Sequence, residues 1–116
     1  MKTKEVKFSK SLFKIKLQIE KELSKGDKTN EDLYKLISKA NDFLIHGRIG
    51  IPVSKKLPLF KYYNDKFGVT NLFLIKISKE GRAVYTNVSG GESKILQIIL
   101  QVHKNHKDYE KVGGYE

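Results

Sequence analysis

The pattern of apolar and polar positions divides the chain into alternating, helical and irregular stretches. Residues 3–8 alternate between polar and apolar side chains, which predicts a short strand. Ser9 or Ser11 can cap a following helix, and Gly26 with Asp27 ends it after about Lys25. Apolar side chains recur along this helix at a spacing of three or four, at Leu12, Ile15, Ile19 and Leu23, with Phe13 and Leu17 widening the face.

A second helix is predicted from Thr29 to Gly47. Thr29 is a suitable N-cap, and two acids follow in the first turn, where the helix dipole favours negative charge. The expected buried stripe consists of Leu33, Leu36, Ile37, Ala40, Phe43 and Leu44. The two helices are therefore expected to form a hairpin, each with one apolar face.

Residues 47–71 show no regular period, because glycines and prolines interrupt them. Their aromatic and aliphatic content is too high for free disorder, so the stretch is expected to be an ordered loop or short helical turn lying on a sheet.

Three strands are predicted next, at residues 72–77, 82–88 and 94–103, joined by short glycine-containing turns. The last strand is apolar on both faces, which indicates a central, doubly covered position. The short connections predict an antiparallel meander. The expected fold class is α+β: a short N-terminal strand, a two-helix hairpin, a three-stranded antiparallel meander and a short C-terminal helix.

Length and composition narrow the class of protein. The 116 residues predict a single domain, 1–116, with no apolar run of the roughly 18 residues that would suggest a membrane span. The N-terminus lacks the apolar core of a signal peptide, so a cytoplasmic location is expected. The absence of cysteine excludes thiol catalysis and disulfides, and three histidines give no convincing metal cage. No cofactor is expected.

The net charge of +10 indicates an anionic partner, such as nucleic acid or the ribosome. A solvated lysine-rich surface is the alternative. With 21 lysines but only two arginines, Arg82 is unusual among the cations. An arginine within a strand, with histidines and a tyrosine after a later strand, suits phosphate binding and proton transfer.

The order of these elements, with three short motifs, resembles the RelE/ParE superfamily of type II toxin–antitoxin toxins. The motifs are Leu72-Phe-Leu-Ile-Lys-Ile77, Gly81-Arg-Ala-Val-Tyr-Thr86 and His106-Lys-Asp-Tyr-Glu-Lys111, the last resembling HigB-like members. The resemblance implies a metal-independent mRNA endoribonuclease acting on translated mRNA. It also implies that the ribose 2′-OH attacks the adjacent phosphate and that a cognate antitoxin neutralises the toxin.

The resemblance also implies roles for individual residues. Arg82 and Lys76 match a strand arginine and lysine that hold the scissile phosphate. His106, or His103 three residues earlier, matches the proton-transferring group, and Tyr109 matches a tyrosine that orients the substrate. Each residue has a structural alternative: a salt bridge of Arg82 to Glu80 or Glu92, a snorkelling lysine, a surface histidine, or a tyrosine packing the last helix.

Further cations are candidate RNA contacts. Lys104 and Lys107 would position phosphates. Lys55, Lys56 and Lys61 alternate with Phe60, Tyr62 and Tyr63, so this stretch could contact RNA by charge and stacking, or anchor the loop.

Two other functions remain open. A ParE-like protein would inhibit DNA gyrase and catalyse nothing, and the titratable residues at 103–109 argue against it. A non-catalytic, basic nucleic-acid-binding domain is the third possibility.

Overall fold

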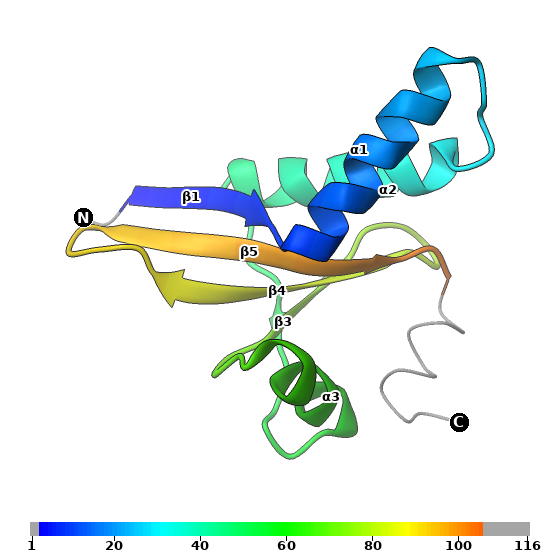
Figure 1. The fold of residues 1–116 in the computed structure, drawn as a ribbon. Coiled ribbons are helices and arrows are strands. Elements are labelled where there is room, and N and C mark those ends of the chain that lie inside the picture. The colour runs from blue at the N-terminus through cyan, green and yellow to red at the C-terminus, as the bar shows by residue number, and fades with distance from the viewer. Residues whose placement is uncertain (1–2, 106–116) are drawn as a thin grey trace.

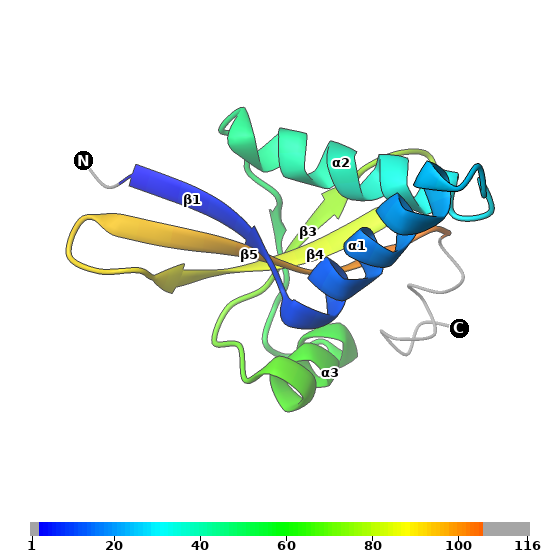
Figure 2. The same ribbon diagram turned by 45° about the horizontal axis from the view of Figure 1, so that its top comes forward.

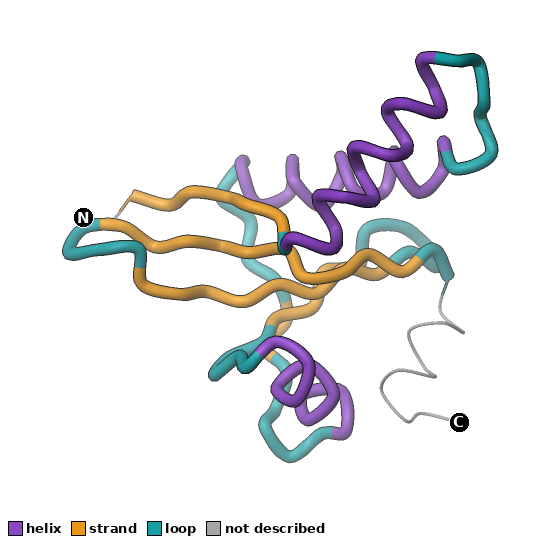
Figure 3. The backbone as a smooth tube through the Cα atoms, viewed as in Figure 1, coloured by secondary structure: helices purple, strands orange, loops and turns teal. Residues whose placement is uncertain are grey.

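The chain forms one twisted sheet with helices on both faces, as the computed structural model shows for residues 3–105 (Figure 1). The elements, in chain order, are β1 (Thr3–Phe8), α1 (Lys10–Ser24), α2 (Glu31–Ile45), β2 (Ile51–Pro52), α3 (Pro58–Phe67), β3 (Phe73–Lys76), β4 (Arg82–Ser89) and β5 (Lys94–His103). The hairpin end of β4 and β5 extends with β1 beyond the helices (Figure 3).

Ser9 links the first helix to the sheet. Its hydroxyl accepts a hydrogen bond from the Leu12 amide at 3.2 Å, as an N-cap does, and donates to the Leu100 carbonyl at 2.8 Å. The predicted strand at 3–8 and the helix after it are confirmed. Because one buried hydroxyl bonds both segments, the start of α1 is fixed against β5.

The second helix is also confirmed, but its start differs from the prediction. The N-cap is Asn30 rather than Thr29, whose hydroxyl instead donates to Asp27 at 2.6 Å. Such a side-chain bond within the turn competes with helix capping. Ile37, Ala40 and Leu44 of this helix are buried, as the apolar stripe predicts.

The predicted fold class is wrong, because the sheet has five strands and is mixed rather than a three-stranded antiparallel meander. Its strand order is β1-β5-β4-β3-β2. β3, β4 and β5 do run antiparallel, but β1 pairs in parallel with β5, and β2 adds an edge strand to β3. The predicted C-terminal helix falls outside residues 3–105.

Two features explain this difference. The alternation of apolar and polar residues in a strand does not show which strand it pairs with. A parallel partner must come from a distant segment, because the connection between two parallel strands is long. β5 is apolar on both faces and lies between β1 and β4, so its predicted central position is confirmed. β2 has only two residues, one of them Pro52, which is too short a signal to detect.

Residues 47–71 contain a full helix rather than a loop or single turn. α3 begins with Pro58 in its first turn and ends at Gly68, whose φ of 71° is the left-handed conformation that glycine adopts readily. It buries Leu59, Phe60 and Tyr63. α3 covers the face of the sheet opposite to α1 and α2 (Figure 2).

The sheet therefore separates two cores. Ile75, Ala83, Tyr85 and Ile99 face α1 and α2, whereas Leu74, Val84 and Leu100 face α3. This alternation along each strand fixes which side chains share a face with α3.

Candidate functional site

Three of the predicted site residues lie in one row across the sheet. Lys76 of β3 is directly opposite Arg82 of β4, which is opposite His103 of β5. Opposed residues of adjacent strands share a face, and Val84, two residues beyond Arg82, belongs to the core under α3. This basic row, Lys76–Arg82–His103, therefore lies at one end of the α3 side of the sheet.

Arg82 is nearly buried, with 9% of its surface exposed. Its Nη1 donates to the carbonyls of Gly81 at 3.0 Å, Ser78 at 3.1 Å and Lys79 at 3.4 Å. Within residues 3–105, the guanidinium forms no salt bridge, so the alternative of a bridge to Glu80 or Glu92 does not occur. Arg82 thus holds the β3–β4 turn and adds an uncompensated positive charge between Lys76 and His103.

His103 is held by a tyrosine from α3. The Tyr63 hydroxyl donates to Oε1 of Gln101 at 2.9 Å and lies 2.8 Å from Nε2 of His103. The Tyr63 hydroxyl thus ties His103 and Gln101 of β5 to α3.

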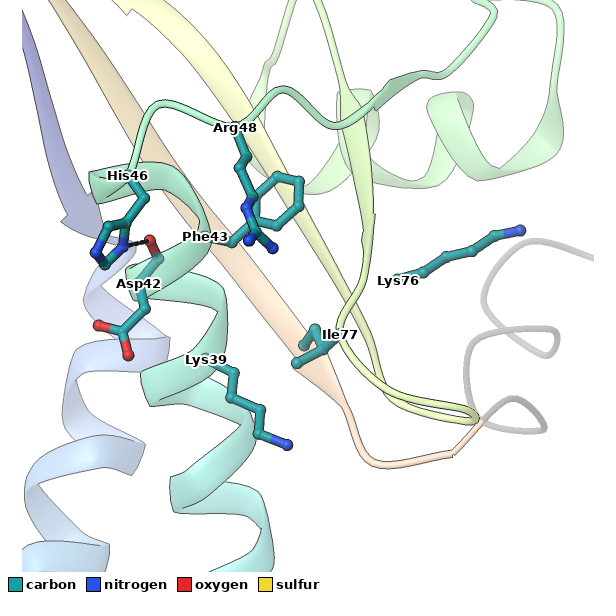
Figure 4. Close-up of a pocket in the computed structure, with 7 residues that line it drawn as sticks. All are labelled: Lys39, Asp42, Phe43, His46, Arg48, Lys76 and Ile77. Carbon is teal, nitrogen blue, oxygen red and sulfur yellow. Dashed lines mark hydrogen bonds between the residues drawn. The ribbon is translucent and has the colours of Figure 1, made fainter.

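Lys76 is the exposed cation of the row. No ion pair joins it to another residue in the described part of the chain. Its side chain extends away from α2 (Figure 4). An exposed ammonium at this end of the row is suited to bind a phosphate oxygen.

A hollow of about 360 Å³ adjoins the row where β5 extends beyond its pairing with β1. Lys66, Gln101 and His103 line it together with Ser11, Leu12, Ile15, Leu33, Leu100 and Val102. Lys66, Tyr63 and Gln101 were not predicted as catalytic residues. Tyr62 and Lys66 are four residues apart, as are Tyr63 and Phe67. This helical spacing within 47–71 could have grouped Tyr63 and Lys66 on one helix.

The other predicted RNA contacts are less concentrated. Lys104 is exposed just after the row, whereas His106, Lys107 and Tyr109 fall outside the described residues. Lys55 and Lys56 are exposed in the turn before α3. On α3, Lys61 forms an exposed ion pair with Asp65 at 3.6 Å. The structure does not bring these three lysines into contact with the row.

The aromatic residues of this stretch were predicted either to stack on RNA or to anchor the segment, and the structure separates the two roles. Tyr63 is fully buried and Phe60 is 6% exposed, so neither ring can stack on a base. Tyr62 is exposed, and the Lys66 ammonium lies 5.6 Å from its ring centre. Tyr62 and Lys66 therefore form an exposed cation–aromatic contact on α3.

No group of three or more potential metal-ligating side chains occurs within residues 3–105. Over the same residues, no helix has the length and apolar character needed to cross a bilayer. Comparison with protein-family models, curated proteins and solved structures finds no match to this chain.

Proposed function

We propose that the protein is the toxin of a type II toxin–antitoxin pair, a metal-independent endoribonuclease that cleaves translated mRNA. The observation that carries the proposal is the alignment of Lys76, Arg82 and His103 in one row, with His103 held by Tyr63. The row leads directly into the segment that contains His106 and Tyr109. The proposal rests on these residues and on the family that they resemble, not on the fold.

In the proposed reaction the ribose 2′-oxygen attacks the adjacent phosphorus, and the bond from phosphorus to the 5′-oxygen breaks. The products are a cyclic phosphate end and a 5′-hydroxyl end. Lys76 binds a non-bridging phosphate oxygen, and the Arg82 charge beneath it favours the added negative charge of the transition state.

Proton transfer in this scheme falls to the histidines. His106 takes the 2′-hydroxyl proton and returns a proton to the leaving 5′-oxygen, and His103 is the alternative group. Tyr109 orients the substrate, and Lys104 and Lys107 position neighbouring phosphates. A cognate antitoxin is the expected protein partner.

One observation favours a second candidate function. Because Arg82 donates hydrogen bonds to three turn carbonyls, its guanidinium also stabilises the β3–β4 turn. A basic nucleic-acid-binding domain without catalysis would retain this arrangement.

The test is induced expression in a bacterial host, followed by growth measurement and primer extension on a translated mRNA. We expect the wild type to arrest growth and produce new cleavage ends, and Lys76→Ala with His106→Ala to abolish both. Lys79→Ala is the matched control, because Lys79 is an exposed lysine of the adjacent turn outside the row. It should cleave like the wild type.

Other results would point elsewhere. Arrest without RNA cleavage would favour a gyrase inhibitor, and RNA binding without arrest or cleavage would favour the non-catalytic domain. Undiminished cleavage by the folded double variant would refute the assigned site.

A further inference from the structure

A second basic hollow lies on the opposite side of the sheet from the basic row. This α2–β3 pocket has a volume of about 410 Å³ and lies between the second half of α2 and β3 (Figure 4). Its lining consists of Lys39, Asp42, Phe43, His46, Arg48, Lys76 and Ile77. Since β2 pairs only with Phe73 and Leu74, the outer edge of β3 has no strand partner from Ile75 onward among the described residues. The pocket thus adjoins an open sheet edge.

The pocket carries excess positive charge. Lys39 and Arg48 contribute two cations, and no salt bridge joins either of them to another residue within 3–105. Lys76 lines the β3 edge of the pocket, with its side chain directed away from α2 (Figure 4). Asp42 is the only acid in the lining, and its carboxylate points away from the Lys39 ammonium (Figure 4). Unneutralised cations around a concave surface attract and concentrate anions.

The remaining lining suits a flat, apolar group next to the anion. Phe43 packs partly against the core, and the Arg48 guanidinium lies 6.0 Å from its ring centre. Ile77 forms an adjacent apolar wall. Arginine and phenylalanine can each stack on a nucleobase, and lysine and arginine can bind its phosphate. A nucleotide unit matches this combination better than a simple inorganic anion does.

Lys76 connects the pocket to the proposed catalytic face. It lines the α2–β3 pocket and is also the exposed end of the basic row on the other side of the sheet. A single strand crossing the open edge of β3 at Lys76 would contact both sides.

We infer that the α2–β3 pocket is a second RNA-binding site, in which Lys39 and Arg48 bind a backbone phosphate flanking the one at the basic row. The inference rests on the proposed function for the identity of the polymer. The pocket would bind substrate on the side of β3 away from the reacting phosphate.

The test measures binding separately from cleavage. A fluorescent single-stranded 2′-O-methyl oligoribonucleotide, which lacks the attacking hydroxyl, is titrated with protein at a series of salt concentrations, and anisotropy gives the affinity. Lys39→Ala with Arg48→Ala should weaken binding roughly tenfold at low salt. It should also reduce the slope of log affinity against log salt by about 0.7 for each phosphate that the variant no longer binds.

The matched control is Lys21→Ala with Lys28→Ala, which removes the same charge from exposed positions around the α1–α2 connection. It should keep the wild-type slope. All variants are compared by circular dichroism and melting temperature; both pocket side chains are exposed, so an unchanged fold is expected.

Equal slopes for the pocket variant and the control would overturn the inference, as would failure of the oligonucleotide to bind while an acidic peptide does. A pocket-dependent slope without mRNA cleavage by the wild type would support this site and reject the proposed enzyme. Cleavage by the wild type, with no effect of the pocket variant on binding, would support the proposed enzyme and reject this site.

Discussion

At the scale of single residues, the arrangement around His103 depends on a hydroxyl from a different element. Tyr63 lies on α3, forty positions before His103, and its hydroxyl bonds both His103 and Gln101. His103 could be selected from the sequence as a candidate, but its hydrogen-bond partner on α3 could not.

Tyr63→Phe tests this role. Removing the hydroxyl takes away its bonds to the Gln101 oxygen and to His103, so we expect a loss of about 1–3 kcal/mol in the free energy of unfolding. If His103 acts in cleavage, the pH profile of the cleavage rate should also shift. Tyr62→Phe is the control, since the exposed Tyr62 hydroxyl has only a 3.5 Å contact with Lys66. Equal stability of the two variants would contradict the assigned network.

The structural role of Arg82 cannot be inferred from its residue type. Its rarity and its place in a strand identify it as a distinctive cation. Its burial and its three bonds to turn carbonyls depend on the backbone path from Ser78 to Gly81. Only this geometry reveals a structural role beside the proposed electrostatic one.

At the scale of elements, a polar cluster ties the two helices of the hairpin together. Glu20 of α1 accepts hydrogen bonds from Lys16 at 2.8 Å and from the Tyr34 hydroxyl of α2 at 2.7 Å. These bonds, that from Lys16 first, lower the pKa of Glu20 below its ordinary value. The apolar stripes predict that the helices pack together, whereas the Glu20–Tyr34 bond requires their actual alignment.

The lowered pKa gives this cluster a pH dependence. A carboxylate with a lower pKa in the folded state contributes stability above its unfolded pKa and loses it as pH falls through the folded pKa. Unfolding of the wild type in denaturant should therefore become easier below about pH 4. Glu20→Gln should flatten this part of the stability profile.

Glu92→Gln serves as the comparison, because Glu92 is exposed in the β4–β5 loop and has no hydrogen bond to another described residue. Its profile should follow that of the wild type. Identical acid profiles for both variants would show that the Glu20 cluster does not act in this way.

At the scale of the whole molecule, the sheet is covered on both faces, and α3 completes the second core. Leu59 and Tyr63 of α3 are almost fully buried against Leu74, Val84 and Leu100. The same helix supplies the hydroxyl that holds His103. The segment predicted to be an ordered loop or short helical turn on the sheet is thus a structural layer that supports the candidate site.

Leu59→Ala tests this view. Truncating a buried leucine removes apolar contacts and leaves a cavity, so we expect a loss of about 2–5 kcal/mol, measured by denaturant unfolding. Leu57→Ala, two residues earlier and 37% exposed, should lose much less. If α3 were only loosely attached, the two substitutions would have similarly small effects.

The sequence by itself determined the local elements, because hydrophobic period and capping act over a few residues. It identified β1, the two long helices, the three later strands and the central place of β5. It also selected Lys76, Arg82 and His103 as candidates. Only the tertiary structure decided that β1 joins β5 in parallel, that α3 closes a second core, and that these three residues form one row. Such pairings depend on which distant segments bury one another, and no local pattern encodes that choice.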